Sequence, residues 1–114
     1  MQDQLITSKL IIEDPGLIDL VDRFISRLPG MHDAITKAYD DNEWEVFVDL
    51  IHQMKGVGGN YGYSELTTLC SDIEVAAKEQ NFEKVKSQLK EFKLLSESIV
   101  AGKDENRNIA KALS

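Results

Sequence analysis

Residues 47–62 constrain the fold most, because they begin as an amphipathic helix and then carry three glycines just after a histidine and a lysine. At about 100° per residue, one face of this helix carries Phe47, Ile51, Met54 and Gly58. The adjoining face carries Val48, His52, Gly56 and Gly59. His52 therefore lies beside the apolar stripe, on a face with few bulky side chains around it.

The glycines at positions 56, 58 and 59 need an explanation, because together they would cost a helix about 3 kcal/mol relative to alanine. That is a large part of the roughly 5–15 kcal/mol that stabilises a typical domain. One interpretation is that the helix stops at Lys55, with Gly56 as its C-cap. The other is that the helix continues to about Asn60, and that the missing side chains let a second protein approach His52.

The chemistry of His52 and Lys55 favours the second interpretation. A neutral imidazole has an unperturbed pKa of about 6.5 and is an available nucleophile near neutral pH. A phosphoryl group on that ring would bring up to two negative charges. Lys55, one turn further along, would place an ammonium close enough to offset them.

These residues resemble the signature of the histidine phosphotransfer (HPt) domain family, H-x-x-K-G followed by small residues and a further glycine. In this chain the signature corresponds to His52, Lys55 and Gly56, followed by Gly59 and Gly62. The likeness covers residues 8 to 102. It includes Asp14-Pro15, Leu28-Pro29, Asp41-Asn42-Glu43-Trp44 and Leu69-Cys70-x-x-Ile73-Glu74.

The resemblance implies a phosphocarrier rather than an enzyme. His52 would accept a phosphoryl group from the phospho-aspartate of a receiver domain and pass it to another receiver, with a sensor or hybrid histidine kinase upstream. Lys55 would stabilise the phosphoryl group, and Glu74 would orient the imidazole ring. A docking platform would comprise Gly56, Gly59, Gln53 and Val48. No cofactor is expected on this chain, because Mg²⁺ would be held by the receiver.

The charge of the chain excludes some classes of partner. Thirteen Lys and Arg stand against 20 Asp and Glu, for a formal charge of -7. Such a surface repels nucleic acid and anionic lipid. The first 30 residues lack the pattern of a signal peptide, and no apolar run approaches the roughly 20 residues of a membrane span. We therefore expect a soluble cytoplasmic protein, and nothing in the sequence requires more than a monomer.

Apolar residues at spacings of three and four predict four helices, and no alternating strand pattern occurs. The fold class is therefore all-α, an up-and-down antiparallel four-helix bundle with a short N-terminal extension. We assign residues 1–102 to this bundle and residues 103–114 to a polar C-terminal tail that frays. The N-terminal residues 1–13 form either a first helical turn or an extended lead-in.

Turn and capping residues predict where the helices begin and end. Asp14 and Pro15 open the first helix, which Pro29-Gly30 should kink or break before it resumes to about residue 40. The other expected caps are Asp41 or Asn42, Ser64, and Asn81. The first stripe should bury Leu17, Leu20, Val21, Phe24 and Leu28. The last should bury Phe82, Val85, Leu89, Phe92 and Ile99.

Other functions fit the sequence less well. A non-catalytic acidic adaptor, in which the glycines only permit close helix packing, is the main alternative. The spacing of Asp49 and His52 is half of a di-iron site, but the second half is absent, so we expect no metal. No serine or cysteine shares a face with His52 for hydrolysis, and Gly56–Gly59 lacks the features of a nucleotide loop. Cys70 lies on an apolar stripe and is expected in the core.

Overall fold

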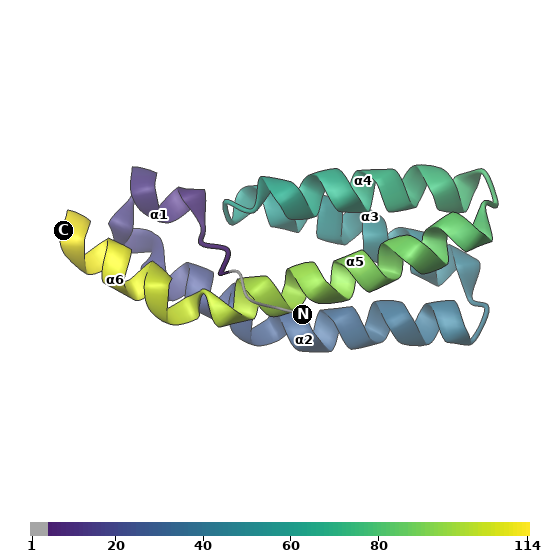
Figure 1. Cartoon of the computed structure of the whole chain (residues 1–114), viewed down its shortest axis with the longest axis horizontal. Coiled ribbons are helices and arrows are strands. Elements are labelled where there is room, and N and C mark those ends of the chain that lie inside the picture. Colours follow the sequence, from purple (N-terminus) through teal and green to yellow (C-terminus); the bar gives the residue numbers. More distant parts are fainter. Residues whose placement is uncertain (1–4) are drawn as a thin grey trace.

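The computed structural model describes residues 5–114, and these residues are almost entirely helical (Figure 1). The helices are α1 (Lys9–Glu13), the 3-10 helix η1 (Pro15–Leu17), α2 (Ile18–Asp40), α3 (Trp44–Asn60), α4 (Ser64–Lys78), α5 (Phe82–Ala101) and α6 (Lys103–Leu113). No strand occurs in the described part, so the all-α prediction is confirmed. Residues 1–4 of the expected N-terminal extension lie outside the described residues.

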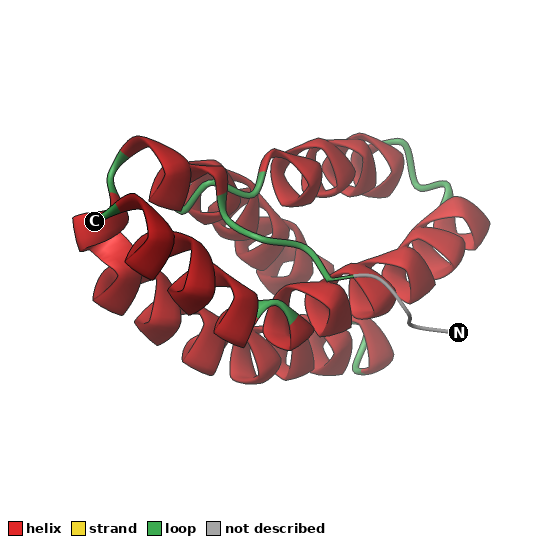
Figure 2. Cartoon of the chain, turned by 60° about the vertical axis from the view of Figure 1, so that its left-hand side comes forward, coloured by secondary structure: helices red, strands yellow, loops and turns green. Residues whose placement is uncertain are grey.

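The four long helices, α2 to α5, pack so that each contacts two of the others. The second helix, α2, contacts α3 and α5, and α4 contacts the same two helices from the other side. Figure 2 shows that short connections join successive helices. Their facing sides bury one apolar core, whose largest members are Tyr63, Phe24, Phe47 and Phe92. The short helices α1 and α6 pack against each other and against η1, at one end of the molecule (Figure 1).

Helix α2 continues through Pro29 without a break. Proline removes one backbone hydrogen bond and costs a helix about 3 kcal/mol. Burial on both sides of the proline offsets this cost, because Ile25 and Leu28 precede it and Ile35 and Ala38 follow it in the core. The segment is therefore one helix, which the sequence pattern left undecided.

Two of the expected caps are correct. The Asp14 Oδ1 atom accepts a hydrogen bond from Gly16 N at 3.0 Å and opens η1. Likewise Asn81 Oδ1 accepts from Lys84 N and opens α5. The cap expected at Asp41 or Asn42 is wrong, because α3 begins after Glu43, which makes no side-chain cap.

Backbone conformation explains the misplaced caps. Asn42 has φ +58° and belongs to the turn between α2 and α3, so its side chain is not placed to cap. Ser64 is the first residue of α4 rather than its cap, and Tyr63 occupies the cap position without a side-chain bond. Both helices are therefore started by packing of Phe47 and Leu66 in the core rather than by a capping side chain.

The prediction of a frayed tail after residue 102 is wrong, because Lys103–Leu113 form the regular helix α6. Its anchor is Asn106, which is fully buried, accepts from Ser8 N at 2.9 Å and donates to the Tyr63 hydroxyl at 3.2 Å. Arg107 forms an ion pair with the buried carboxylate of Asp22. The residues that contact α6 lie far from it in the sequence. The polar composition of residues 103–113 therefore gave no indication that they form a packed helix.

The segment before α1 ties the two ends of the described chain together. Ile6 N donates to Ser98 O at 3.1 Å, and Lys9 N donates to Gly62 O at 3.0 Å. The Ser8 hydroxyl donates to Tyr61 O, in the turn between α3 and α4. Gly62 has φ +87°, which only glycine adopts without strain. The described part of the N-terminal extension, residues 5–13, is thus an extended lead-in followed by one short helix.

Two apolar residues expected in the core are exposed. Leu20 is 39% exposed and Phe82 is 44% exposed. Phe82 instead stacks on Trp44, with ring centroids 4.6 Å apart, outside the core. Cys70 is fully buried, as expected, and burial raises the pKa of its thiol to about 12. None of the described helices combines the length and apolar character that crossing a membrane requires.

Candidate functional site

Helix α3 presents two faces that match the sequence pattern. Its buried residues are Phe47, Ile51, Met54 and Gly58, and the helix runs through the glycines to Asn60. The interpretation in which the helix stops at Lys55 is therefore wrong. The side chain of His52 is 64% exposed and stands about halfway along this helix. The imidazole is thus held on a rigid element and is open to a partner.

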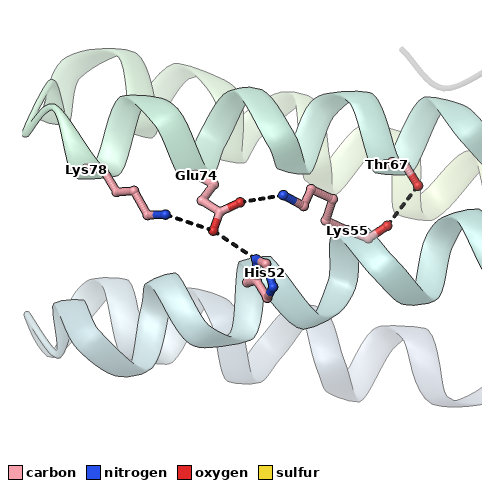
Figure 3. A network of polar contacts seen from close by, with 5 residues as sticks. All are labelled: His52, Lys55, Thr67, Glu74 and Lys78. Atoms are coloured by element: carbon pink, nitrogen blue, oxygen red, sulfur yellow. Dashed lines mark hydrogen bonds and ion pairs between the residues drawn. The ribbon is translucent and has the colours of Figure 1, made fainter.

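The carboxylate of Glu74, on α4, contacts the basic side chains of His52, Lys55 and Lys78 (Figure 3). Glu74 Oε2 lies 3.0 Å from His52 Nδ1, and Glu74 Oε1 accepts from Lys55 Nζ at 2.8 Å. Lys78 Nζ lies 3.3 Å from Glu74 Oε2. The Glu74 side chain is only 9% exposed, so the three basic groups cover it. His52, Lys55 and Glu74 therefore form one cluster, as their positions in the resembling family imply.

Electrostatics keep Glu74 ionised and thereby set the tautomer of His52. The hydrogen bond from Lys55, assisted by those from His52 and Lys78, lowers the pKa of Glu74 to about 2 against the opposing effect of burial. An ionised carboxylate can only accept hydrogen bonds, so His52 Nδ1 must carry the proton. The lone pair of the neutral ring is then on Nε2, and Figure 3 shows this second nitrogen directed away from Glu74.

The three glycines of α3 differ in the space that surrounds them. A Cβ atom at Gly56 would meet nothing within 4 Å, whereas one at Gly58 would lie 3.0 Å from Leu66 Cβ. A Cβ atom at Gly59 would lie 3.1 Å from Thr67 Oγ1. Gly58 therefore lets the backbones of α3 and α4 approach, as the adaptor alternative supposed for all three. Gly56 and Gly59 are both exposed, but only Gly56 faces open space.

Two other residues of the predicted platform lie in separate hollows. Val48 is half-buried and lines a cavity of about 470 Å³ between α3 and the end of α4, together with Trp44 and Lys78. Gln53 is exposed and lines a cavity of about 520 Å³ between α2 and α3, with Met31 and Val57. Val48 and Gln53 therefore line different hollows, one between α3 and α4 and one between α2 and α3.

Sequence reasoning missed Lys78 and Thr67. Lys78 follows Glu74 by four residues on one helix, a spacing that brings an acid and a base together and could have identified the pair. Thr67 Oγ1 donates to the backbone oxygen of Lys55 at 2.8 Å and so fixes α3 against α4 beside the site. No local pattern identifies a contact of this kind between two helices.

Among residues 5–114, no three histidine, cysteine, aspartate or glutamate side chains converge as a metal site would require. The three basic groups around Glu74 already neutralise its charge. What the cluster can do chemically is hold an exposed nitrogen nucleophile in one tautomer and supply positive charge beside it.

We expect Glu74→Gln to lower the stability of the protein at pH 7 by about 1–2 kcal/mol, a range reduced for the solvent exposure of the partners. The pKa of Glu74 falls from 4.5 to about 2 on folding, so its contribution is complete above pH 4.5 and is lost as the pH falls towards 2. Urea unfolding at pH 7 and at pH 3 measures this. Glu91→Gln, on the exposed side of α5, is the control for removing one charge. An unchanged gap between wild type and Glu74→Gln at the two pH values would contradict the prediction.

Comparison with known proteins supplies one match. The sequence model described as the Hpt domain matches residues 19–102 of the chain, which include α3, α4 and the cluster around His52. No curated protein and no solved structure matches the chain.

Proposed function

The chain belongs to the Hpt domain family, and from this premise we propose that His52 is the residue that carries the phosphoryl group. Hpt domains are phosphocarrier modules of two-component phosphorelays. We infer further that α2, α3, α4 and α5 form the up-and-down antiparallel four-helix bundle of such a module. One observation carries the proposal, the exposed imidazole whose Nδ1 is bound to an ionised carboxylate.

The transfer step follows from that tautomer. The Nε2 lone pair attacks the phosphorus of a phospho-aspartate on a receiver domain, a P–N bond forms, and the P–O bond to the receiver carboxylate breaks. The imidazole becomes positively charged because its Nδ1 keeps its proton, and Glu74 stabilises this charge through the existing hydrogen bond. In the reverse sense, the ring leaves as a neutral imidazole when a second receiver takes the phosphoryl group.

The lysines complete the electrostatic arrangement. Lys55 donates to Glu74 in the structure, at the end of the carboxylate away from His52. Its side chain is 31% exposed and is flexible enough to turn towards a phosphoryl group on the ring. Lys78 would then remain to balance Glu74. We therefore assign Lys55 to phosphoryl stabilisation and Glu74 to orientation of His52.

The partners follow from the family. We propose that receiver domains dock over α3 and that a sensor or hybrid histidine kinase supplies the phosphoryl group upstream. Mg²⁺ and most of the transition-state stabilisation would belong to the receiver, because phosphoryl transfer is mainly positioning and charge neutralisation. We propose that this exchange takes place in the cytoplasm with a monomeric carrier. Nucleic acid is not among the proposed partners, since the formal charge is -7.

The experiment that tests the proposal is incubation of the chain with a receiver carrying a radioactive phospho-aspartate. The expected label on this chain is stable in alkali and lost in acid, as a phosphoramidate on histidine is. Absence of such label with every receiver of the source cell would remove the basis of the proposal. An adaptor that only binds would take no label but would still form a complex with its partner.

We expect Gly56→Gln to stabilise the fold and to slow the transfer. Glutamine is a better helix former than glycine by about 0.5–1 kcal/mol, and a Cβ at this position meets nothing within 4 Å. The longer side chain would, however, stand in the space one turn from His52 that a receiver must enter. Urea unfolding and the rate of label transfer measure the two effects. Unslowed transfer in a folded Gly56→Gln protein would show that the bare surface is unnecessary.

A further inference from the structure

All three arginines of the chain line one cavity, which lies between α2 and α6. Arg23 and Arg27 contribute from α2, and Arg107 contributes from α6 together with Lys103. The cavity has a volume of about 500 Å³, and Ser26 also lines it. Four cations and one carboxylate, that of Asp22, thus line one hollow in a protein whose formal charge is -7.

Among residues 5–114, three of these four cations have no acidic partner. Arg107 forms an ion pair with Asp22 and lies 3.8 Å from Asp19. For Arg23, Arg27 and Lys103, no ion pair occurs within the described part of the chain, although the protein carries 20 Asp and Glu. The contacts that hold α6 in place come from Asn106 and from the pair of Arg107 with Asp22, and none of them involves the other three cations.

The arrangement also costs stability. Arg23 and Arg27 are four residues apart on one helix, and so are Lys103 and Arg107 on the other. Like charges at this spacing destabilise a helix. Two such pairs line one hollow, in which Asp22 is the one carboxylate and is paired with Arg107, so positive charge remains in excess there. A bound anion would offset this excess charge.

We propose that this cavity binds a small molecule that carries a chain of two or more phosphate groups. The planar fork of arginine matches phosphate oxygens and donates two parallel hydrogen bonds, which an ammonium does not. The volume lies within the range of about 300–1,000 Å³ that is usual for small-molecule sites. Ser26 supplies a neutral donor, and the exposed side chain of Leu20 supplies an apolar wall for an organic group.

The site is separate from His52. The cavity is lined from α2 and α6, whereas His52, Lys55 and Glu74 lie on α3 and α4. Binding can therefore be measured without any receiver, and its failure would leave the phosphocarrier proposal unaffected. Ser26 and Arg27 also border the groove between α2 and α3 that contains Gln53, so the two hollows adjoin.

The test is isothermal titration calorimetry of the full chain with inorganic pyrophosphate and, separately, with ADP, both without divalent cations. We expect saturable binding of at least one probe with a dissociation constant below about 1 mM. Arg23→Gln/Arg27→Gln should weaken it by about 10- to 100-fold, since each lost contact is a charge-assisted hydrogen bond. The matched control is Lys86→Gln/Lys90→Gln, an exposed pair of cations at the same spacing on α5. It should change binding by less than about threefold, because exposed distant charges are screened.

The two probes distinguish the source of the affinity. Tighter binding of ADP than of pyrophosphate would show that an organic group occupies the cavity beside Leu20, and equal binding would show recognition of the phosphate chain alone. Circular dichroism confirms that both double variants are folded. Either of two results would overturn the proposal: no saturation with either probe up to about 10 mM, or equal weakening in the α2 variant and the α5 control.

Discussion

His52→Gln is expected to take no phosphoryl label from a phosphorylated receiver, a loss of more than about 10³-fold in transfer. Glutamine approximates the length of the side chain and can still hydrogen-bond to Glu74, but it offers no ring nitrogen lone pair as a nucleophile. Because the side chain of His52 is 64% exposed, the fold should be retained with little change in stability. Electrophoresis of the acid-labile label, with circular dichroism as the test of folding, measures both expectations.

The other histidine provides the matched control for this substitution. His32 lies on α2 with its side chain 17% exposed, and its ring packs 5.3 Å from that of Phe92. His32→Gln should therefore retain full transfer while losing some stability through the lost packing. Label that persists in His52→Gln, or that disappears in His32→Gln while the protein stays folded, would show that the phosphoryl group is carried elsewhere.

Gly62→Ala is expected to destabilise the protein by about 2–4 kcal/mol, because two costs coincide at this turn. The backbone has φ +87°, a conformation that L side chains rarely adopt. The new Cβ would also collide with Ser8 Oγ and with the backbone nitrogen of Leu10. The N-terminal segment would have to leave the turn, and its bonds from Ser8 to Tyr61 and from Lys9 to Gly62 would be lost. Urea unfolding at neutral pH measures the loss.

A second glycine separates this effect from the general effect of replacing glycine. Gly30 lies inside α2, and a Cβ there would meet nothing within 4 Å. Gly30→Ala should therefore stabilise the protein by about 0.5–1 kcal/mol, the ordinary gain in a helix interior. If Gly62→Ala were as stable as wild type, the left-handed turn and its contacts with Ser8 would not be contributing as the structure implies.

The sequence predicted the buried and exposed faces of α3 correctly, because the information for them is local. The spacing of Phe47, Ile51, Met54 and Gly58 identified the buried face, and the same spacing placed His52 on the exposed one. The wider family resemblance of the segment from Leu69 to Glu74 implied a position for Glu74 beside His52, and the two side chains are in contact between α3 and α4. Helical periodicity and a sequence motif can both be identified from the sequence alone. The expected positions of His52 and Glu74 therefore agree with the structure.

The parts that the sequence did not predict depend on contacts between distant segments. The helix at 103–113 is anchored by Asn106, whose partners Ser8 and Tyr63 lie at the other end of the chain and in the turn after α3. A polar residue in a charged stretch gives no sign that it is buried. The continuity of α2 through Pro29 was equally hidden, because it depends on packing against other helices. Capping preferences failed at Asn42 because the turn needed its left-handed backbone.

The bonds among Ser8, Asn106 and Tyr63 bear on where the cooperative folding unit of this chain ends. The family match stops at residue 102, yet the hydroxyl of the fully buried Tyr63 accepts its hydrogen bond from Asn106 of α6, which lies outside the matched region. Ile11 of α1 and Ala110 of α6 also enter the same interior. A fragment limited to residues 19–102 would lose the contacts from α1 and α6. One end of its apolar core would then be exposed to solvent. We therefore expect the cooperative folding unit to extend beyond residues 19–102 at both ends.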